Sequence, residues 1–250
     1  MAPLTNLDGK NAVVTGGSNG IGAATVRMLA DLGARVMFSY HRREDAAREL
    51  MATLPGSGHE IIQLDLGDAA SVEAMAAQAA KSFKTINILV NSAGFTKPIP
   101  HKNLDALDIA VFDSVLIANV RGPYSVIRAL VPLLRASGDA AIVNVSSISG
   151  FTGSGSSVVY CASKAALDSL TMSLGRALGP EIRVVSVSPG AVATDFVAGR
   201  DRAVLEADAP KTPLKKVIEA DDVAQAIIAC VTHLRRTTGA RIIVDGGRHL

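Results

Sequence analysis

The segment Asn11-Ala12-Val13-Val14-Thr15-Gly16-Gly17-Ser18-Asn19-Gly20-Ile21-Gly22 decides the fold that we expect for this chain. Its first five residues predict an apolar strand, and a helical run follows from Ile21 to Leu32. The glycines between them permit a tight turn and a close approach of the backbone to a pyrophosphate. The free N–H groups at the start of the helix favour the same anion. This strand–turn–helix context therefore predicts a nucleotide-binding turn.

Strand-like and helix-like segments alternate along the rest of the chain. Further strands are predicted at 34–39, 59–64, 86–90, 140–145, 183–187 and 241–244. Helices are predicted at 42–53, 68–83, 104–135 (divided into two at Gly122-Pro123), 158–178 and 221–233, with irregular segments at 146–157 and 194–216. Such alternation builds right-handed βαβ units around a parallel sheet. We therefore predict an α/β fold with one doubly wound parallel sheet of about seven strands and helices on both faces.

The composition indicates a soluble globular protein of 250 residues, with 48% apolar residues and a net charge of +2. No run of Lys and Arg is long enough for a nucleic-acid footprint. The polar start, Met1 to Lys10, lacks the features of a signal peptide, and no apolar run approaches the ~18 residues of a membrane span. The only cysteines, Cys161 and Cys230, predict neither a disulfide scaffold nor a metal site and fit a reducing cytoplasm.

Tyr160 and Lys164 have the i, i+4 spacing that places two side chains on one face of a helix. A free phenol has a pKa near ~10, and a cation held beside it would lower that pKa toward neutrality. Tyr124 and Arg128 have the same spacing, so the spacing alone is a weak signal. The stronger signal is Ser147, which ends a predicted strand shortly before Tyr160, where ligands of open α/β sheets bind.

Together these motifs resemble those of the short-chain dehydrogenase/reductase family in its Tyr-x-x-x-Lys form. Thr15 to Gly22 matches the family's Thr-Gly-x-x-x-Gly-x-Gly turn, and Asn91-Ser92-Ala93-Gly94 resembles its Asn-Asn-Ala-Gly segment, with Ser92 replacing the second Asn. Ser147, Tyr160-to-Lys164 and Pro189-Gly190 follow in the family's order. The resemblance implies a single NAD(P)-binding Rossmann-fold domain over residues 1–250. It also implies an oxidoreductase that interconverts a ketone or aldehyde and an alcohol by hydride transfer.

The resemblance also implies roles at the reacting end. Tyr160 would be the general acid in reduction and the base in oxidation, and Lys164 would lower the pKa of Tyr160 and contact the nicotinamide ribose. Ser147 would donate a hydrogen bond to the substrate carbonyl. Asn119 would hold a water that links Lys164 to solvent. Ser146 is an alternative to Ser147, but neighbouring strand residues face opposite ways, so we expect only one of them to enter the cleft.

The end of the second predicted strand indicates the preferred cofactor. An acidic residue there would bind the ribose hydroxyls, but the segment from Phe38 to Arg43 has none. Arg42 and Arg43 could instead bind a 2′-phosphate, which favours NADP(H) over NAD(H). With the positions that the resemblance implies, the expected cofactor-binding residues are Gly16, Ser18, Asn19, Gly20, Ile21, Tyr40, His41, Arg42, Arg43, Asp65, Leu66, Asn91, Ala93, Gly94, Tyr160, Lys164, Pro189, Gly190, Val192 and Thr194.

The segment from about 195 to 216 is expected to form a substrate lid, because irregular segments over a rigid cleft often carry specificity. Candidate wall residues of the substrate site are Phe95, Ile99, Phe151, Val192, Phe196 and Leu205. The small-molecule substrate itself is not indicated. One alternative is a 3-oxoacyl carrier-protein reductase, although Glu181 stands where those reductases often have a basic residue. Another is a non-catalytic nucleotide-binding sensor or scaffold. By resemblance, the chain would form a homotetramer or homodimer.

A hydrolase is disfavoured, because a Ser nucleophile needs a His base within hydrogen-bond reach. The sequence has no Gly-x-Ser-x-Gly segment. The histidines are His41, His59, His101, His233 and His249, and we expect all of them to be surface residues. None has metal-ligand spacing, so we expect no metal. We also expect a cytoplasmic location with neither nucleic acid nor membrane as a partner.

Overall fold

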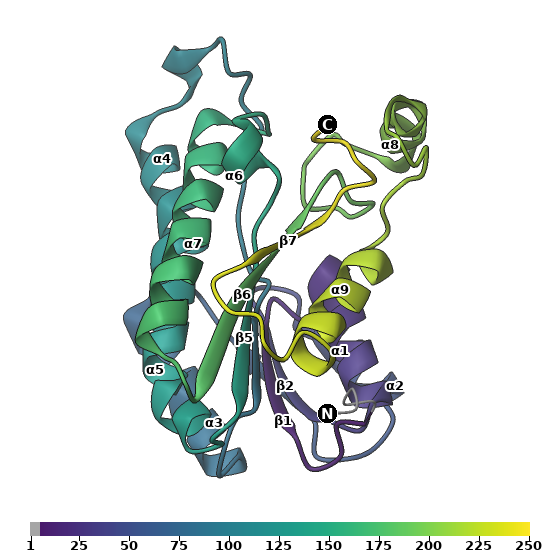
Figure 1. The fold of residues 1–250 in the computed structure, drawn as a ribbon. Helices are drawn as coiled ribbons and strands as arrows, with labels where there is room; N and C mark the ends of the chain where they lie inside the picture. The colour runs from purple at the N-terminus through teal and green to yellow at the C-terminus, as the bar shows by residue number, and fades with distance from the viewer. Residues whose placement is uncertain (1–5) are drawn as a thin grey trace.

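The computed structural model describes residues 6–250, and its centre is a parallel sheet of seven strands in the order β3-β2-β1-β4-β5-β6-β7 (Figure 1). The strands are β1 (Asn11–Thr15), β2 (Arg35–Tyr40), β3 (Glu60–Gln63), β4 (Ile88–Asn91), β5 (Ala140–Val145), β6 (Ile182–Pro189) and β7 (Arg241–Val244). All seven predicted strands are present, with small shifts at their ends. The predicted doubly wound α/β fold is therefore confirmed.

Helices cover both faces of the sheet. They are α1 (Gly20–Asp31), α2 (Glu44–Thr53), α3 (Ala69–Ser82), α4 (Ile109–Leu116), α5 (Gly122–Arg135), α6 (Ser149–Thr152), α7 (Val158–Ala177), α8 (Arg202–Asp208) and α9 (Ala220–Thr232). Figure 1 shows α1, α2 and α9 on one side of the sheet and α3, α4, α5 and α7 on the other. The helices that connect the strands thus shield the apolar strands from water on both sides.

Two segments that we predicted to be irregular contain helices. Residues 146–157 include α6, and residues 194–216 include α8, followed by the 3-10 turn Ala209–Lys211. The side chain of Asp201 caps α8 by accepting a hydrogen bond from the backbone N–H of Val204 at 3.0 Å. An N-terminal cap of this kind satisfies a helix N–H that would otherwise lack a partner. The prolines in this segment do not prevent the helix, because Pro210 lies beyond its end.

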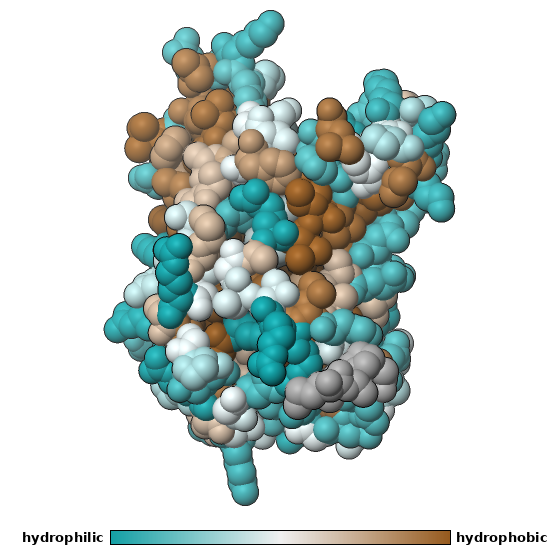
Figure 2. Space-filling model, in the orientation of Figure 1, coloured by the Kyte–Doolittle hydropathy of each residue, from teal (hydrophilic) through white to brown (hydrophobic). Residues whose placement is uncertain are grey.

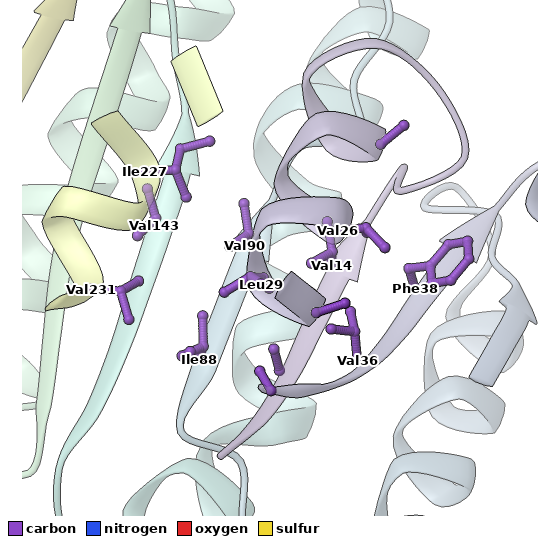
Figure 3. Close-up of a cluster of buried hydrophobic side chains, with 14 of the residues drawn as sticks. Val14, Val26, Leu29, Val36, Phe38, Ile88, Val90, Val143, Ile227 and Val231 are labelled. Atoms are coloured by element: carbon purple, nitrogen blue, oxygen red, sulfur yellow. The ribbon is translucent and has the colours of Figure 1, made fainter. Parts of the chain in front are cut away.

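Side chains alternate between the two faces along each strand, so the hydrophobic core consists of two clusters, one on each face of the sheet. Val14 belongs to the cluster shown in Figure 3, in which Val26 and Leu29 of α1 and Ile227 of α9 pack against the sheet. Its neighbour Val13 belongs to the opposite cluster, which contains buried residues of α3 and α5. Successive strand side chains point to opposite faces, so a strand buried on both sides is mostly apolar along its length. This requirement explains the continuous apolar runs in the sequence.

The long helical region changes its geometry next to Gly122-Pro123, where we predicted a division, but it remains helical from Ile109 to Arg135. A π-helical segment, Ile117–Arg121, joins α4 directly to α5, which begins at Gly122. Pro123 is the second residue of α5 and has no N–H with which to bond back to the π-helical turn that precedes it. Single π-helical turns within longer helices are rare and frequent at functional sites. This turn contains Asn119, which is 1% exposed.

The strand order reverses between β1 and β4, which pair side by side. Open α/β sheets bind ligands at such a point, outside the carboxyl ends of the strands. Within residues 6–250, no helix is long and apolar enough to cross a membrane. The part of the polar start that precedes Asn6, for which we expected no signal peptide, lies outside the described residues.

Candidate active site

A pocket of about 780 Å³ lies at the carboxyl ends of the central strands. The β1–α1 turn, the segments after β4, β5 and β6, α7, the lid and the C-terminal tail all contribute to its wall. In Figure 2 the lobe with α8 stands apart from the body, and hydrophobic side chains gather between the two. The predicted site residues that line this pocket are Gly16, Ser18, Asn19, Gly20, Ile21, His41, Ala93, Gly94, Ser147, Tyr160, Lys164, Pro189, Gly190, Val192 and Thr194.

In the β1–α1 turn, glycines allow other groups to approach the backbone closely. Gly16 has a φ of +65°, and a Cβ there would lie 2.8 Å from the Cα of Ala93. Gly20 has a φ of +51°, and a Cβ there would lie 3.1 Å from the Cγ2 of Thr194. The Asn19 side chain caps α1 by accepting from the N–H of Gly20 at 2.8 Å. A side chain at Gly16 would collide with the backbone of Ala93, so glycine is needed for this close-packed turn, whose helix N-terminus suits a dinucleotide pyrophosphate.

The remaining predicted residues do not line the pocket; they are Tyr40, Arg42, Arg43, Asp65, Leu66, Asn91 and Asn119. Asn91 instead donates a buried hydrogen bond to Asn144 Oδ1 at 2.9 Å and thereby links β4 to β5. Asp65 lies at the pocket's edge, where its Oδ2 is 3.7 Å from Nε2 of the pocket residue His41. Arg42 and Arg43 are exposed beyond β2. Leu66 packs against Gly122 at the start of α5.

Tyr160 lies in the first turn of α7 and is 9% exposed. Ser157 caps this helix by accepting from the N–H of Tyr160 at 3.3 Å. Burial raises the pKa of Tyr160 to about 12, while a hydrogen bond with the Ser147 side chain and the charge of Arg200 oppose that rise. The phenol is therefore protonated at neutral pH and lies beside Ser147, but its pKa is far above the pH at which a general acid works best.

Lys164 lies one turn further along α7, 5% exposed, with its ammonium 5.7 Å from the centre of the Tyr160 ring. The ammonium donates a hydrogen bond to the carbonyl of Val145 at 2.8 Å. Burial lowers the pKa of Lys164 to about 8, and the charge of Asp168 opposes this effect. A Cβ on Gly94 would lie 3.9 Å from the ammonium nitrogen, so the β4 end and α7 meet here.

The expected effect of Lys164 on Tyr160 is not found in this structure. We expected the ammonium to lower the pKa of the phenol, but burial raises it, and the opposing groups are Ser147 and Arg200. The reason is geometric: the ammonium is directed at the Val145 carbonyl. Desolvation disfavours the charged form of each group, so both tend toward neutrality.

The expectation that only one of Ser146 and Ser147 enters the cleft is wrong. Both residues line the pocket, because β5 ends at Val145 and the strand alternation does not continue beyond it. Their roles differ. The Ser146 hydroxyl donates to the carbonyl of Lys164 at 3.3 Å, whereas the Ser147 hydroxyl accepts from the N–H of Ser149 at 3.1 Å. The Ser147 hydrogen is not used by the backbone and can be directed at the Tyr160 phenol or at a ligand oxygen.

The side chain of Asn119 is fully engaged in the structure. It accepts from the N–H of Phe95 at 2.8 Å and donates to the carbonyl of Phe95 at 2.9 Å and to Ser163 Oγ at 3.0 Å. These bonds join the π-helical turn to the segment after β4 and to α7. Because both amide hydrogens are used, a bound water would have to donate, either to the second lone pair of Oδ1 or to the backbone carbonyl of Asn119.

The lid and the C-terminal tail form the outer wall of the pocket. Of the candidate wall residues, Val192, Phe196 and Leu205 line it, while Phe95, Ile99 and Phe151 do not. The Phe196 ring lies 6.0 Å from that of Tyr160, centre to centre. His249, which we expected at the surface, is partly exposed. It lines the pocket, and its Nδ1 lies 2.8 Å from Asp245 Oδ2.

Several lining residues were not identified from the sequence. They are Ser92, Val145, Ile148, Ser149, Thr152, Ser154, Gly155, Ser156, Ala191, Asp195, Val197, Arg200, Asp208, Arg248 and His249. Most adjoin residues that we had identified. Arg248 and His249 are the exceptions, because they reach the pocket from the chain's end. The sequence offers one signal for them: the lid segment that comes to lie opposite them contains charged residues.

Comparison with known proteins agrees with this geometry. Residues 16–249 match the family model described as "Enoyl-(Acyl carrier protein) reductase". A 3alpha-hydroxysteroid dehydrogenase from Mediterraneibacter gnavus is 34% identical, covering 96% of this chain and 97% of the relative. A cis-4-hydroxycyclohexanecarboxylate dehydrogenase from Sinomonas cyclohexanicum is 35% identical, with 94% and 95% covered. The chain therefore belongs to the short-chain dehydrogenase/reductase family, whose members bind a nicotinamide cofactor.

A solved structure shows the same fold. The Pseudomonas aeruginosa RhlG/NADP active-site complex is 31% identical, covers 100% of both chains and has a TM-score of 0.89. The similarity therefore extends over the sheet, the nucleotide turn and the lid together.

Proposed function

We propose that this protein is an NADP(H)-dependent oxidoreductase that interconverts a ketone or aldehyde and an alcohol, with Tyr160 as the general acid/base. The observation that carries the proposal is the meeting of Ser147, Tyr160 and Lys164 in one pocket with the glycine turn. The names of two relatives support it, because both denote dehydrogenases of hydroxylated ring compounds. We also propose that the chain acts as one cofactor-binding domain with its lid at about 195–216.

A nicotinamide cofactor, when bound, supplies or accepts the hydride. The Ser147 hydroxyl donates a hydrogen bond to the substrate oxygen and stabilises the charge that develops there. The Tyr160 phenol, protonated at neutral pH, gives its proton to that oxygen in reduction. In oxidation the same oxygen returns its proton to Tyr160. Lys164 contacts the ribose of the cofactor. Asn119 holds a water, and the proton that Tyr160 gives up is replaced from this water through Lys164. Phe196 and Leu205 exclude other water from the reacting atoms.

We propose a preference for NADP(H) on the basis of Arg42 and Arg43. Both are exposed at the end of β2, close in sequence to the pocket residue His41, and no carboxylate of residues 6–250 lies within 4.0 Å of either. Both can therefore pair with a 2′-phosphate, which needs cationic partners. The solved NADP complex of the Pseudomonas aeruginosa relative is consistent with this preference.

One alternative has a specific observation in its favour. The description of the matching family model names an acyl carrier protein, so the substrate could be attached to such a carrier. Glu181, which we expected to disfavour such a carrier, directly precedes β6, whereas the pocket lies at the other end of that strand beside Pro189, so this carboxylate does not bear on carrier docking at the pocket. We also expect the subunits to assemble as a homotetramer or homodimer.

A panel of carbonyl and alcohol substrates with NADPH, NADH and their oxidised forms tests the proposal. We expect turnover of at least one carbonyl compound, faster with NADPH than with NADH. A protein that binds NADPH but transfers hydride to no compound would support the non-catalytic alternative instead.

A further inference from the structure

The side chain of Arg200 lines the pocket on the lid side, and the proposed reaction does not use it. Arg200 lies between the turn after β6 and α8, and its backbone N–H donates to the carbonyl of Val197 at 3.2 Å. It shares the pocket wall with Tyr160, Phe196 and Leu205. Its Nε is buried and has no hydrogen-bond partner among the residues that the structure describes. The guanidinium is thus held at the pocket with unused donors.

Several other charged groups of the lid and tail are paired. The pairs are Asp208 with Lys211 and Arg248, Arg202 with Glu206 and Glu219, and Asp245 with His249. In contrast, no carboxylate of residues 6–250 lies within 4.0 Å of the Arg200 guanidinium. Asp195 is the other unpaired charge on the lid side of the wall, and it is exposed, so water screens it. The inner part of the pocket is therefore positive on its lid side.

Partial burial of a cation without a counter-ion costs free energy, and the pKa of Arg200 reflects this cost. Burial lowers the pKa of Arg200, the Tyr160 phenol raises it, and Arg248 lowers it. A guanidinium nevertheless stays protonated in proteins and offers five N–H donors in a planar fork. That fork matches a carboxylate, which can accept two parallel hydrogen bonds. An anionic group that enters the pocket would accept hydrogen bonds from Arg200 for which the protein supplies no acceptor.

We propose that Arg200 binds a carboxylate of the substrate, so that the protein selects oxo acids or hydroxy acids over their neutral analogues. The proposal rests on the proposed function, because the reacting carbon of the same molecule must face Tyr160. Both residues line one pocket, and each influences the charge of the other. A substrate with its carboxylate on Arg200 and its carbonyl at Tyr160 would have both ends fixed. Such two-point attachment converts binding energy into orientation.

The test compares 4-oxocyclohexanecarboxylate with its methyl ester as substrates, using NADPH. Arg200→Met keeps an unbranched apolar stem and removes the guanidinium with its charge. We expect this variant to lose at least tenfold in kcat/KM for the acid, mainly through KM, and less than twofold for the ester. Arg200→Lys should recover part of the loss, since it restores a cation without the planar fork. Lys216→Met, which removes an exposed cation outside the pocket wall, should change neither value.

Equilibrium binding of both compounds to the NADP⁺-saturated protein separates this proposal from the proposed function. If neither compound reacts, yet wild-type protein binds the acid at least tenfold more tightly than Arg200→Met does, the reaction is wrong and the Arg200 assignment stands. Equal affinity of both proteins for the acid overturns the assignment. So does an equal loss with acid and ester. A weaker NADPH affinity in Arg200→Met also overturns it, because Arg200 would then serve the cofactor.

Discussion

The ammonium of Lys164 lies 5.7 Å from the centre of the Tyr160 ring but donates its hydrogen bond to the carbonyl of Val145. The two residues therefore share one buried face of α7 without a direct ion pair. Each is pushed toward its neutral form, Tyr160 with a pKa raised to about 12 and Lys164 with a pKa lowered to about 8. The site thus holds a proton on the phenol and keeps a cation of reduced basicity beside it.

Lys164 makes stability depend on pH in a defined window. Its pKa is about 8 in the folded protein and 10.5 in the ordinary, solvated state. Between these values the unfolded chain binds more protons than the folded protein, so the free energy of unfolding rises with pH. We expect the stability of wild type relative to Lys164→Met to increase from pH 8 to about pH 10.5 and to stay level below pH 8. Urea denaturation of both proteins over this range measures it, and a constant difference would contradict the buried ammonium.

Arg42 is predicted to select the phosphorylated cofactor. Arg42→Ala should weaken NADPH binding by at least tenfold, since a charge-assisted pair contributes about 1.5–3 kcal/mol, and should leave NADH binding within twofold. Fluorescence titration of both cofactors measures this. Arg48→Ala is the matched control, because Arg48 is an exposed arginine on α2 that already pairs with Glu44 at the i, i+4 spacing. Equal losses for NADPH and NADH in Arg42→Ala would place Arg42 away from the 2′-phosphate.

Gly16 is predicted to be required for the shape of the nucleotide turn. Gly16→Ala places a methyl group 2.8 Å from the backbone of Ala93 at a φ of +65°. Gly138→Ala is the control, because Gly138 has a φ of +70° with nothing within 4 Å of the added atom. The control should lose about 1–2 kcal/mol of stability from the left-handed backbone alone. Gly16→Ala should lose about 1–3 kcal/mol more from overpacking, together with its cofactor affinity. If Gly16→Ala and Gly138→Ala lowered the denaturant midpoint by similar amounts, the turn would be able to shift to accept the side chain.

Much of the fold was predictable because its determinants are local in sequence. The continuous apolar runs, such as Ala12 to Val14, reflect burial on both faces of the sheet. The change of helix geometry next to Gly122-Pro123 agrees with the missing N–H of proline. The glycine turn was recognisable because the spacing of Gly16, Gly20 and Gly22 records its backbone shape. In each case a short segment carries its own physical requirement.

The parts that could not be predicted depend on contacts between distant segments. The capped helix α8 was missed because its cap, Asp201, is a single residue amid prolines and charges. The approach of His249 to the pocket depends on its contact with Asp245 and on Phe151, whose ring centre lies 5.7 Å away. The sign of the pKa change at Tyr160 was missed because spacing along a helix reveals a neighbouring cation but not the burial of both groups.

The measurement that tests the proposed reaction most directly is hydride transfer by Tyr160→Phe. The variant keeps the ring against Phe196 and removes only the hydroxyl, so fold and cofactor affinity should be preserved. General acid catalysis commonly contributes about 10²–10⁴ in rate, so we expect NADPH oxidation by a carbonyl substrate to fall by at least a hundredfold. NADPH binding should remain within twofold of wild type. Undiminished turnover in Tyr160→Phe would contradict the assignment of Tyr160 as the proton donor.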